Sequence, residues 1–135
     1  MLADALKTLL ATAYALSIKA QNFHWNVEGP DFPQYHDFFG DFYSEVYDNS
    51  IDRLAEIIRQ LDSYTPGSIT RYAQLSQIED QVKIPRAELM MAELLEDSTT
   101  MVSLVTQLFD VATESRDQGV ANYMARSEEH TSELQ

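Results

Sequence analysis

Two histidines and two carboxylates are the residues of this sequence whose types and spacing could perform chemistry. His24 and His36 are twelve residues apart, and Asp52 and Glu56 are four apart, which puts both carboxylates on one face of a helix. Imidazole and carboxylate ligands suit iron, and they suit zinc or manganese equally well. A histidine beside a Gly-Pro turn is more often a hydrogen-bonding residue, and such carboxylates are more often solvated surface. Spacing alone therefore leaves both a metal site and an ordinary structural role open.

Four long helices are predicted to position these residues. Apolar residues recur at spacings of three and four from about Leu2 to Val27, from Asp31 to about Leu61 and from Pro85 to about Thr113, and a fourth helix starts near Gln118. A short helix from Thr70 to Ile78 interrupts the long connection between the second and third helices. No strand pattern is present. We therefore expect an all-α four-helix bundle with a short extra helix in that connection.

The ends of the second and fourth helices carry specific signals. Asp31 and Asp117 are the predicted N-caps, and Pro33 suits the first turn of the second helix. The apolar period stops after Ala125, where the chain reads RSEEHTSELQ, which looks like the translation of a common sequencing adapter. We therefore expect a domain over residues 1–125, a non-native tail over residues 126–135, a truncated last helix and no function for His130.

Composition and charge restrict the class of protein. The 135 residues are 44% hydrophobic, with four Gly and four Pro, which suits one folded domain. The absence of Cys excludes disulfides, thiolate zinc sites and cysteine nucleophiles. No apolar run is long enough to span a membrane and no signal peptide is recognised, so we expect a cytoplasmic protein without membrane contact. The net charge of −13, or −11 without the last ten residues, repels phosphate backbones and attracts cations.

One common iron-site pattern is absent from the sequence. Four-helix di-iron proteins usually carry Glu-x-x-His on two of their helices, and no Glu-x-x-His occurs here. A complete di-iron site within one subunit is therefore not expected, and any such site must be assembled differently, for example between subunits.

The stretch from Lys19 to Gly29 carries the most specific pattern. It reads KAQNFHWNVEG and resembles the K-A-x-N-[FY]-H-W-N-V-x-G hallmark of the Dps family, the ferritin-like mini-ferritins also called DNA-protecting proteins from starved cells. Two weaker blocks follow in family order, IDRLAE at Ile51–Glu56 and GVANY at Gly119–Tyr123. The resemblance covers residues 2–125. The turn at 66–68 and the helix after it resemble the phage and marine-bacterial branch.

The resemblance implies a ferritin-like fold and a homo-oligomeric shell of twelve subunits. It also implies that His24 and His36 of one subunit meet Asp52 and Glu56 of a two-fold-related neighbour, as catalytic and metal-binding residues. Iron, as Fe2+ and Fe3+, would be bound and oxidised there, preferably by hydrogen peroxide, and stored as ferric oxide. The implied function is a ferroxidase that protects against oxidative damage. Trp25 beside the site would be a sacrificial electron donor or an ordinary interface residue.

The sequence departs from the family pattern at two places. Four residues after His36 the family carries an acidic ligand, and here the residue is Gly40. We include the neighbouring acid Asp41 among the expected metal ligands, although one residue is about 100° around a helix. The spacing from His24 to Asp52 is also one residue longer than in the family. A π-bulge absorbs a single inserted residue, so we predict a bulge or kink between Tyr47 and Ile51.

The family's other activity, DNA binding, is expected to be weak. The chain is acidic, and Lys7 and Lys19 are the only bases of the first predicted helix. Asp110, Glu114 and Asp117 lie where the family has an acidic pore for iron, although capping and solvation explain each of them singly. Two alternatives remain open: a ferritin-like shell or interaction protein without catalysis, and a DNA-coating protein.

Overall fold

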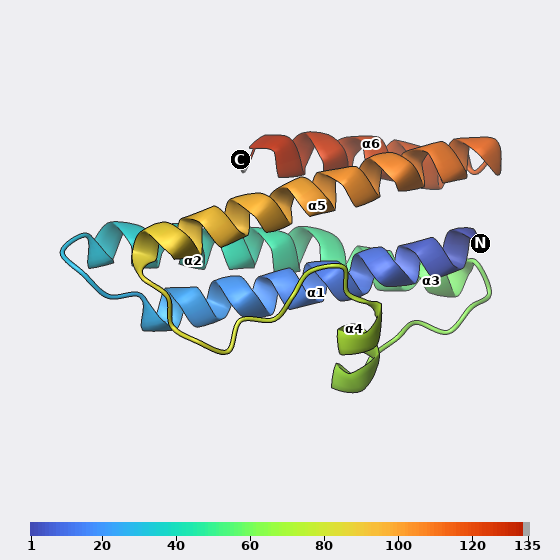
Figure 1. Cartoon of the computed structure of the whole chain (residues 1–135). Helices are drawn as coiled ribbons and strands as arrows, with labels where there is room; N and C mark the ends of the chain where they lie inside the picture. Colours follow the sequence, from blue (N-terminus) through green and yellow to red (C-terminus); the bar gives the residue numbers. More distant parts are fainter. Residues whose placement is uncertain (134–135) are drawn as a thin grey trace.

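The computed structural model describes residues 1–133, with side chains to residue 128, and it is helical with no strand in that range. The long helices form four rods: α1, the run from α2 through η1 to α3, α5 and α6. These rods lie side by side, and a short helix crosses at their flank (Figure 1). The predicted all-α bundle with a short helix in the connection is therefore confirmed. The elements in chain order are α1 (Leu2–Asn26), α2 (Phe32–Val46), η1 (Tyr47–Ile51), α3 (Asp52–Gln60), α4 (Ile69–Leu75), α5 (Ala87–Glu114) and α6 (Gln118–Glu133).

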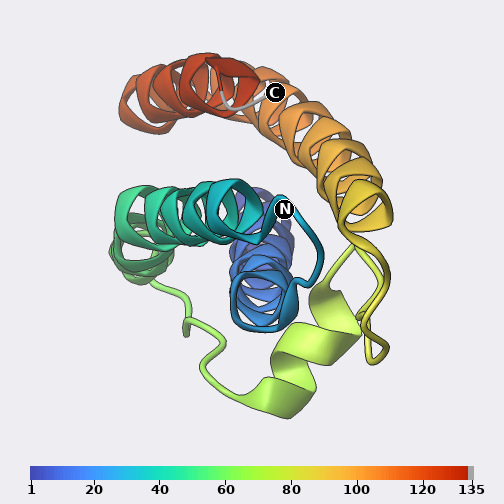
Figure 2. The same ribbon diagram turned by 90° about the vertical axis from the view of Figure 1, so that its left-hand side faces the viewer.

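The second rod is a continuous run of α2, η1 and α3. Seen along the bundle, α1 lies against this run and against α5, while α5 and α6 form an arc on the other side (Figure 2). Burial of apolar side chains along the rods drives this packing. No helix in the described part of the chain is long and apolar enough to cross a membrane. The largest fully buried apolar side chains are Leu6, Leu9, Leu10, Leu16, Phe23, Phe39, Leu54, Ile58, Met90, Val105 and Met124.

The helix starts follow the predicted signals with one exception. Asp117 caps α6 as predicted, because its Oδ1 accepts the N–H of Val120 at 3.1 Å. Asp31 occupies the N-cap position of α2, but its side chain accepts no capping hydrogen bond. Its backbone carbonyl, which accepts the N–H of Tyr35 at 3.2 Å, closes the first turn instead. Asp31 is therefore the N-cap residue of α2, as predicted, although its side chain makes no capping bond.

The predicted bulge is present. Residues Tyr47–Ile51 form a π-helical turn between two α-helical segments. A π-turn takes up one extra residue without turning the segments on either side away from the core, and Val46 and Ile51 are both buried at its ends. Such a turn disturbs the helical hydrogen-bond ladder. The hydroxyl of Tyr123 on α6 donates to the carbonyl of Asn49 at 3.2 Å, which ties the turn to the fourth rod.

A buried ion pair joins α1 to α5. The Nζ of Lys19 lies 2.8 Å from Oδ2 of Asp97 and 3.7 Å from Oε1 of Glu93, and the Lys19 side chain is almost wholly buried. Burial raises the pKa of Asp97 above its usual range, although the bond from Lys19 opposes this shift. The pair fixes α1 against α5 just ahead of His24.

The fourth helix begins at Gln118 as expected and continues to Glu133. It therefore includes part of the segment that we interpret as non-native. The side chain of His130 and the last two residues lie outside the described part of the structure. The origin of residues 126–135 stays a prediction.

Candidate metal centre

The imidazole rings of His24 and His36 stack on each other where α1 ends and α2 begins. Their centroids are 3.9 Å apart and the ring planes differ by 17°. The Nδ1 of His24 lies 2.6 Å from the backbone carbonyl of His36, and the Nδ1 of His36 lies 2.7 Å from the carbonyl of His24. Each histidine therefore donates to the backbone of the other, and both are half-buried.

These two hydrogen bonds fix the chemistry of both rings. A carbonyl oxygen only accepts, so each Nδ1 must carry the proton. In the neutral ring the proton-free nitrogen is then Nε2, whose lone pair is available to a metal. Metal-binding histidines in proteins are typically oriented in this way, by a hydrogen bond from the other ring nitrogen. The structure thus presents two oriented nitrogen donors side by side.

Aromatic side chains hold the pair in place. The ring of Phe32 stacks on His36 at 5.0 Å, and the ring of Tyr43 packs against His24 at 5.6 Å between centroids. Both flanking rings and His36 come from α2, whereas His24 comes from α1, so the stack also closes the α1–α2 junction. Ring contacts of this kind restrict rotation of the imidazoles.

The histidine pair also explains why position 40 is a glycine. A Cβ added at Gly40 would lie 2.8 Å from Cε1 and 2.9 Å from Nδ1 of His24, closer than real Cβ contacts come. The His24 ring therefore occupies the space that a side chain at position 40 would need. The glycine costs helix stability, about 1 kcal/mol relative to alanine, and in return it lets the two imidazoles stack. Asp41, the neighbouring acid, is exposed.

The predicted carboxylates lie elsewhere in the subunit. Asp52 and Glu56 are exposed on α3. Among the described residues the ion pair of Glu56 is an exposed contact of 3.8 Å with Arg53, which contributes little. Sixteen residues of helix separate His36 from Asp52, about 24 Å at 1.5 Å per residue. Among the described residues, no three His, Asp or Glu side chains gather closely enough to hold a metal ion. One subunit therefore brings the histidines together and leaves the carboxylates apart.

The positions of four further residues considered in the sequence analysis follow from the structure. Trp25 is 64% exposed, next to the histidine pair in sequence. Asp110 and Glu114 are exposed on the last turns of α5. The capping bond of Asp117 gives that residue a structural role in the subunit.

The sequence reasoning missed the partner of Lys19. Lys19 falls among apolar positions of α1, between Leu16 and Phe23, and a charged residue on a buried stripe signals a buried partner. Its partner Asp97 is 78 residues away along the chain. No local pattern could have identified that pairing.

The chain is similar to ferritin-like proteins over nearly its whole length. The model of the ferritin-like domain family matches residues 3–133. An uncharacterized low temperature-induced protein of Nostoc sp. is 32% identical, over 90% of this chain and 69% of that protein. A DNA protection during starvation protein of Helicobacter pylori is 30% identical, over 89% and 83%. The crystal structure of a Dps protein from Vibrio cholerae, described as a member of a superfamily of ferritin-like diiron-carboxylate proteins, matches with a TM-score of 0.94 at 26% identity, over 98% and 83%.

Proposed function

Because the chain belongs to the ferritin-like domain family, and within it to the Dps proteins, we propose that it is a mini-ferritin. In this proposal it binds ferrous iron, oxidises it at di-iron sites between subunits, preferably with hydrogen peroxide, and stores the ferric product. Iron is therefore its substrate and cargo, and its activity is that of a ferroxidase. The proteins work as a homo-oligomeric shell, for which the family suggests twelve subunits, and they protect against oxidative damage.

The observation that carries this proposal is the reciprocal histidine pair. Two half-buried imidazoles, each with Nδ1 bonded to a backbone carbonyl, present Nε2 as the donor atom of the neutral ring, and such a pair of nitrogen donors suits iron. A histidine with a purely structural role has no need of a second imidazole stacked upon it. The pair therefore supports a ligand role for His24 and His36 more strongly than their spacing does.

The length of the second rod supports a site shared by two subunits. His36 lies near the start of the α2–η1–α3 run, and Asp52 and Glu56 lie near its far end. A two-fold axis passing near the midpoint, at Ser44, would lay two such runs antiparallel and bring the histidines of each subunit to the carboxylates of the other. Two apolar side chains near that midpoint, Ile18 and Tyr47, are 47% and 48% exposed, as expected for a surface that another subunit covers.

The chemistry follows from the mixed ligand set. Carboxylates and neutral imidazoles stabilise Fe(III) relative to Fe(II), so ferrous iron bound between them gives up an electron readily. Two ferrous ions at one site together supply the two electrons that convert one hydrogen peroxide molecule to water. This stoichiometry avoids a one-electron reduction that would release hydroxyl radical. Exposed Trp25 would supply an electron when only one iron is present.

The surface charge bears on the partners. With a net charge of −13, the subunit is expected to attract ferrous ions and to bind duplex DNA weakly at physiological salt. Asp110 and Glu114 are exposed near the α5–α6 turn, and we propose that they help to gather iron there. The cytoplasm, where ferrous iron is available, is the proposed compartment.

A complementation experiment tests the shared site directly. One variant carries His24→Ala and His36→Ala, and the other carries Asp52→Ala and Glu56→Ala. Each assembled alone should oxidise ferrous iron with peroxide no faster than buffer does, read by ferric absorbance. Mixed assemblies of equal amounts should regain about one quarter of the parent rate, because half of the two-fold interfaces pair unlike subunits and each such interface holds one intact site.

Two results would contradict the proposal in different ways. No recovery in the mixed assembly, with a fully active parent, would mean that the four residues act within one subunit or not at all. A parent that oxidises iron no faster than buffer would leave a second function, a ferritin-like shell without catalysis. Gly40 is the observation that favours this second function, because the family's acidic ligand is missing there.

A further inference from the structure

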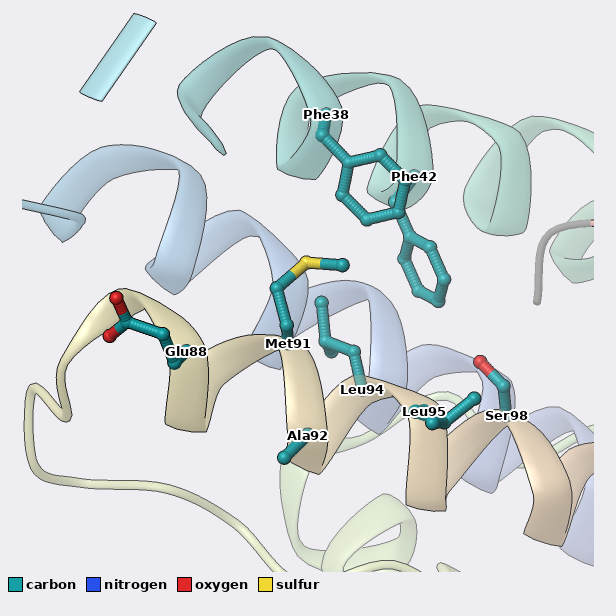
Figure 3. A pocket seen from close by; sticks show the side chains of 8 residues that line it. All are labelled: Phe38, Phe42, Glu88, Met91, Ala92, Leu94, Leu95 and Ser98. Carbon is teal, nitrogen blue, oxygen red and sulfur yellow. The ribbon is translucent and has the colours of Figure 1, made fainter. Parts of the chain in front are cut away.

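The hollows between the helices differ in the side chains that line them. The groove between α2 and α5 encloses about 410 Å³ and is lined mainly by apolar side chains, two phenylalanines among them (Figure 3). A hollow of about 400 Å³ between α1 and α4 is lined by Tyr14 and Tyr72 together with aliphatic residues. Another, of about 350 Å³, is lined by Tyr14, Tyr43 and Tyr47. Phenol rings give up an electron and a proton far more readily than phenylalanine rings, so the tyrosine-lined hollows are suited to redox chemistry.

Tyr14 on α1 and Tyr72 on α4 stack face to face. Their ring centroids are 4.5 Å apart, and the ring planes differ by 15°. None of the residues of α4 is fully buried, and Tyr72 is the residue of this helix that packs against the apolar core. A stack of this kind stabilises the docking of α4 modestly. Packing alone therefore explains the pair, but it does not explain the tyrosines that lead to it.

A row of tyrosines leads from the histidine pair to this stack. The ring of Tyr43 lies 5.6 Å from that of His24 between centroids. Tyr47 follows Tyr43 by one helical turn on the second rod, and its ring meets that of Tyr14 edge-on at 6.0 Å. Electrons hop readily between aromatic rings in such close succession. The tyrosine row, which consists of Tyr43, Tyr47, Tyr14 and Tyr72, therefore connects the histidine pair to α4.

Tyr72 keeps its proton at neutral pH. Burial, and after it the neighbouring phenol groups of Tyr14 and Tyr47, raise the pKa of the Tyr72 hydroxyl above its usual 10.0. Removing an electron from this phenol therefore also releases a proton. Tyr72 is half-buried and borders the open hollow between α1 and α4, so solvent accepts that proton.

We propose that Tyr14 and Tyr72 are the terminal electron donors of the iron site and that their oxidation joins them as dityrosine. This inference rests on the proposed function, which supplies ferrous iron and hydrogen peroxide. The tyrosine row carries the electrons from the stacked pair to the histidine end of the bundle. The new bond links α1 covalently to α4, and like a disulfide it constrains the unfolded chain and raises Tm.

The electrons and atoms of this reaction balance. When a single ferrous ion meets hydrogen peroxide, the iron supplies one electron and a tyrosine of the pair supplies the other. The O–O bond breaks, and the phenol proton with one solvent proton completes two water molecules. A second such event oxidises the other tyrosine. The two phenoxyl radicals form one carbon–carbon bond beside their hydroxyl groups, and the hydrogens of the joined carbons return to the phenol oxygens through solvent. The product has lost two hydrogen atoms.

Limiting iron tests the reaction. The assembled protein receives less than one ferrous ion per subunit without oxygen, and then hydrogen peroxide. The expected product is a cross-link between tryptic peptides 8–19 and 72–83, each of which contains one tyrosine, detected by mass spectrometry in the monomer band of a denaturing gel. Tyr14→Phe and Tyr72→Phe keep the rings and should each abolish the cross-link. Tyr64→Phe, at an 84% exposed tyrosine outside the row, should leave it unchanged. Cross-links found only between chains would overturn the proposal.

A ruthenium oxidant separates the tyrosine pair from the iron site. Tris(bipyridyl)ruthenium, with light and persulfate, oxidises tyrosine without iron and should join Tyr14 to Tyr72 in the parent and in Tyr47→Phe alike. With iron and peroxide, Tyr47→Phe should lose most of the cross-link, because the row is broken. Trp25→Phe, which removes a competing donor, should raise the yield.

The two oxidants make the possible failures distinguishable. No cross-link with ruthenium would overturn the pairing itself. A cross-link with ruthenium alone, while ferric absorbance rises normally with iron and peroxide, would overturn this inference and leave the proposed function standing. Ferric absorbance no faster than in buffer would overturn both. A full yield from Tyr47→Phe with iron would overturn the route through the tyrosine row.

Discussion

The histidine half of the proposed iron site is fixed within the subunit, whereas the carboxylate half is not. His24 and His36 are half-buried, stacked and hydrogen-bonded to each other's backbone. Asp52 and Glu56 are exposed, and the only ion pair between either of them and a described residue is the 3.8 Å contact of Glu56 with Arg53. The nitrogen donors are thus oriented within the subunit, while the exposed carboxylates are not fixed by comparable contacts.

This difference suggests a division of labour. Oriented donors lower the entropic cost of binding and set where iron sits. In the proposed site, exposed carboxylates would adjust as the charge of the iron changes during oxidation. Substitutions near the histidines should therefore alter metal binding in each subunit. Substitutions near α3 should instead act through the proposed interface between subunits.

The π-turn η1 lies between the histidines and the carboxylates along the second rod. A single-residue deletion there, compared with one in a regular helix, should give the largest difference in Tm. Deleting Ser50 should convert η1 into regular α-helix and keep the core faces of α2 and α3 in place, so Tm should fall only slightly. Deleting Ser103 in the regular helix α5 should rotate the rest of that helix by about 100° and unfold the protein, since Val105 and Leu108 would leave the core. Thermal melting followed by circular dichroism measures both. Equal losses of Tm for the two deletions would show that η1 does not accommodate an extra residue.

The buried ion pair that anchors the histidine half is expected to come next. Asp97→Asn leaves the buried Lys19 facing only Glu93 at 3.7 Å, and should cost about 3 kcal/mol of unfolding free energy. The matched control Glu93→Gln, which keeps the 2.8 Å bond, should cost less than about 1 kcal/mol. Denaturant unfolding measures both. Replacing Lys19 and Asp97 together by Met and Leu should recover most of the loss, and a double variant as unstable as Asp97→Asn would argue against a charge effect.

Gly40 allows the histidine half to be loosened by a single added methyl group. Gly40→Ala should favour the helix by about 1 kcal/mol, yet it should lower ferrous affinity by about 10- to 100-fold because its Cβ displaces the His24 ring. Gly40→Asp should weaken binding as well, although it restores an acid at that position. Anaerobic calorimetric titration with Fe2+ reads the affinity. Gly67→Ala is the control, since nothing lies within 4 Å of its Cβ; tighter binding by Gly40→Asp would refute the steric account.

Tyr123 offers the smallest change, on the carboxylate side. Tyr123→Phe removes the bond to the carbonyl of Asn49 in η1 and should cost about 1 kcal/mol at neutral pH. Burial raises the pKa of the Tyr123 hydroxyl above its usual 10.0, so the folded state keeps a proton that the unfolded state loses. Parent stability should therefore fall as the pH rises above 10 toward the folded pKa. Unfolding between pH 8 and 11 should show a shallower alkaline loss in the variant; parallel curves would contradict this.

The sequence was sufficient for the helices and for the π-turn, but not for the contacts between rods. Helical periodicity is a local signal, and the rods follow it. The turn at Tyr47–Ile51 was predictable because the spacing to Asp52 is one residue longer than the family pattern. The reason for Gly40 was not predictable, because the ring that fills its space comes from α1. The pairing of Lys19 with Asp97 was not predictable either, because the two residues are 78 apart in sequence and lie on different helices.

The reciprocal histidine bonds have a consequence for how the chain folds. They join residues only twelve apart in sequence, so closing this loop costs little chain entropy compared with docking α5 and α6. Contacts of short sequence separation form early in helical proteins. We therefore expect the α1–α2 hairpin, with both imidazoles already stacked, to appear before the rest of the bundle. The nitrogen half of the site would then be one of the first parts of the molecule to reach its final geometry.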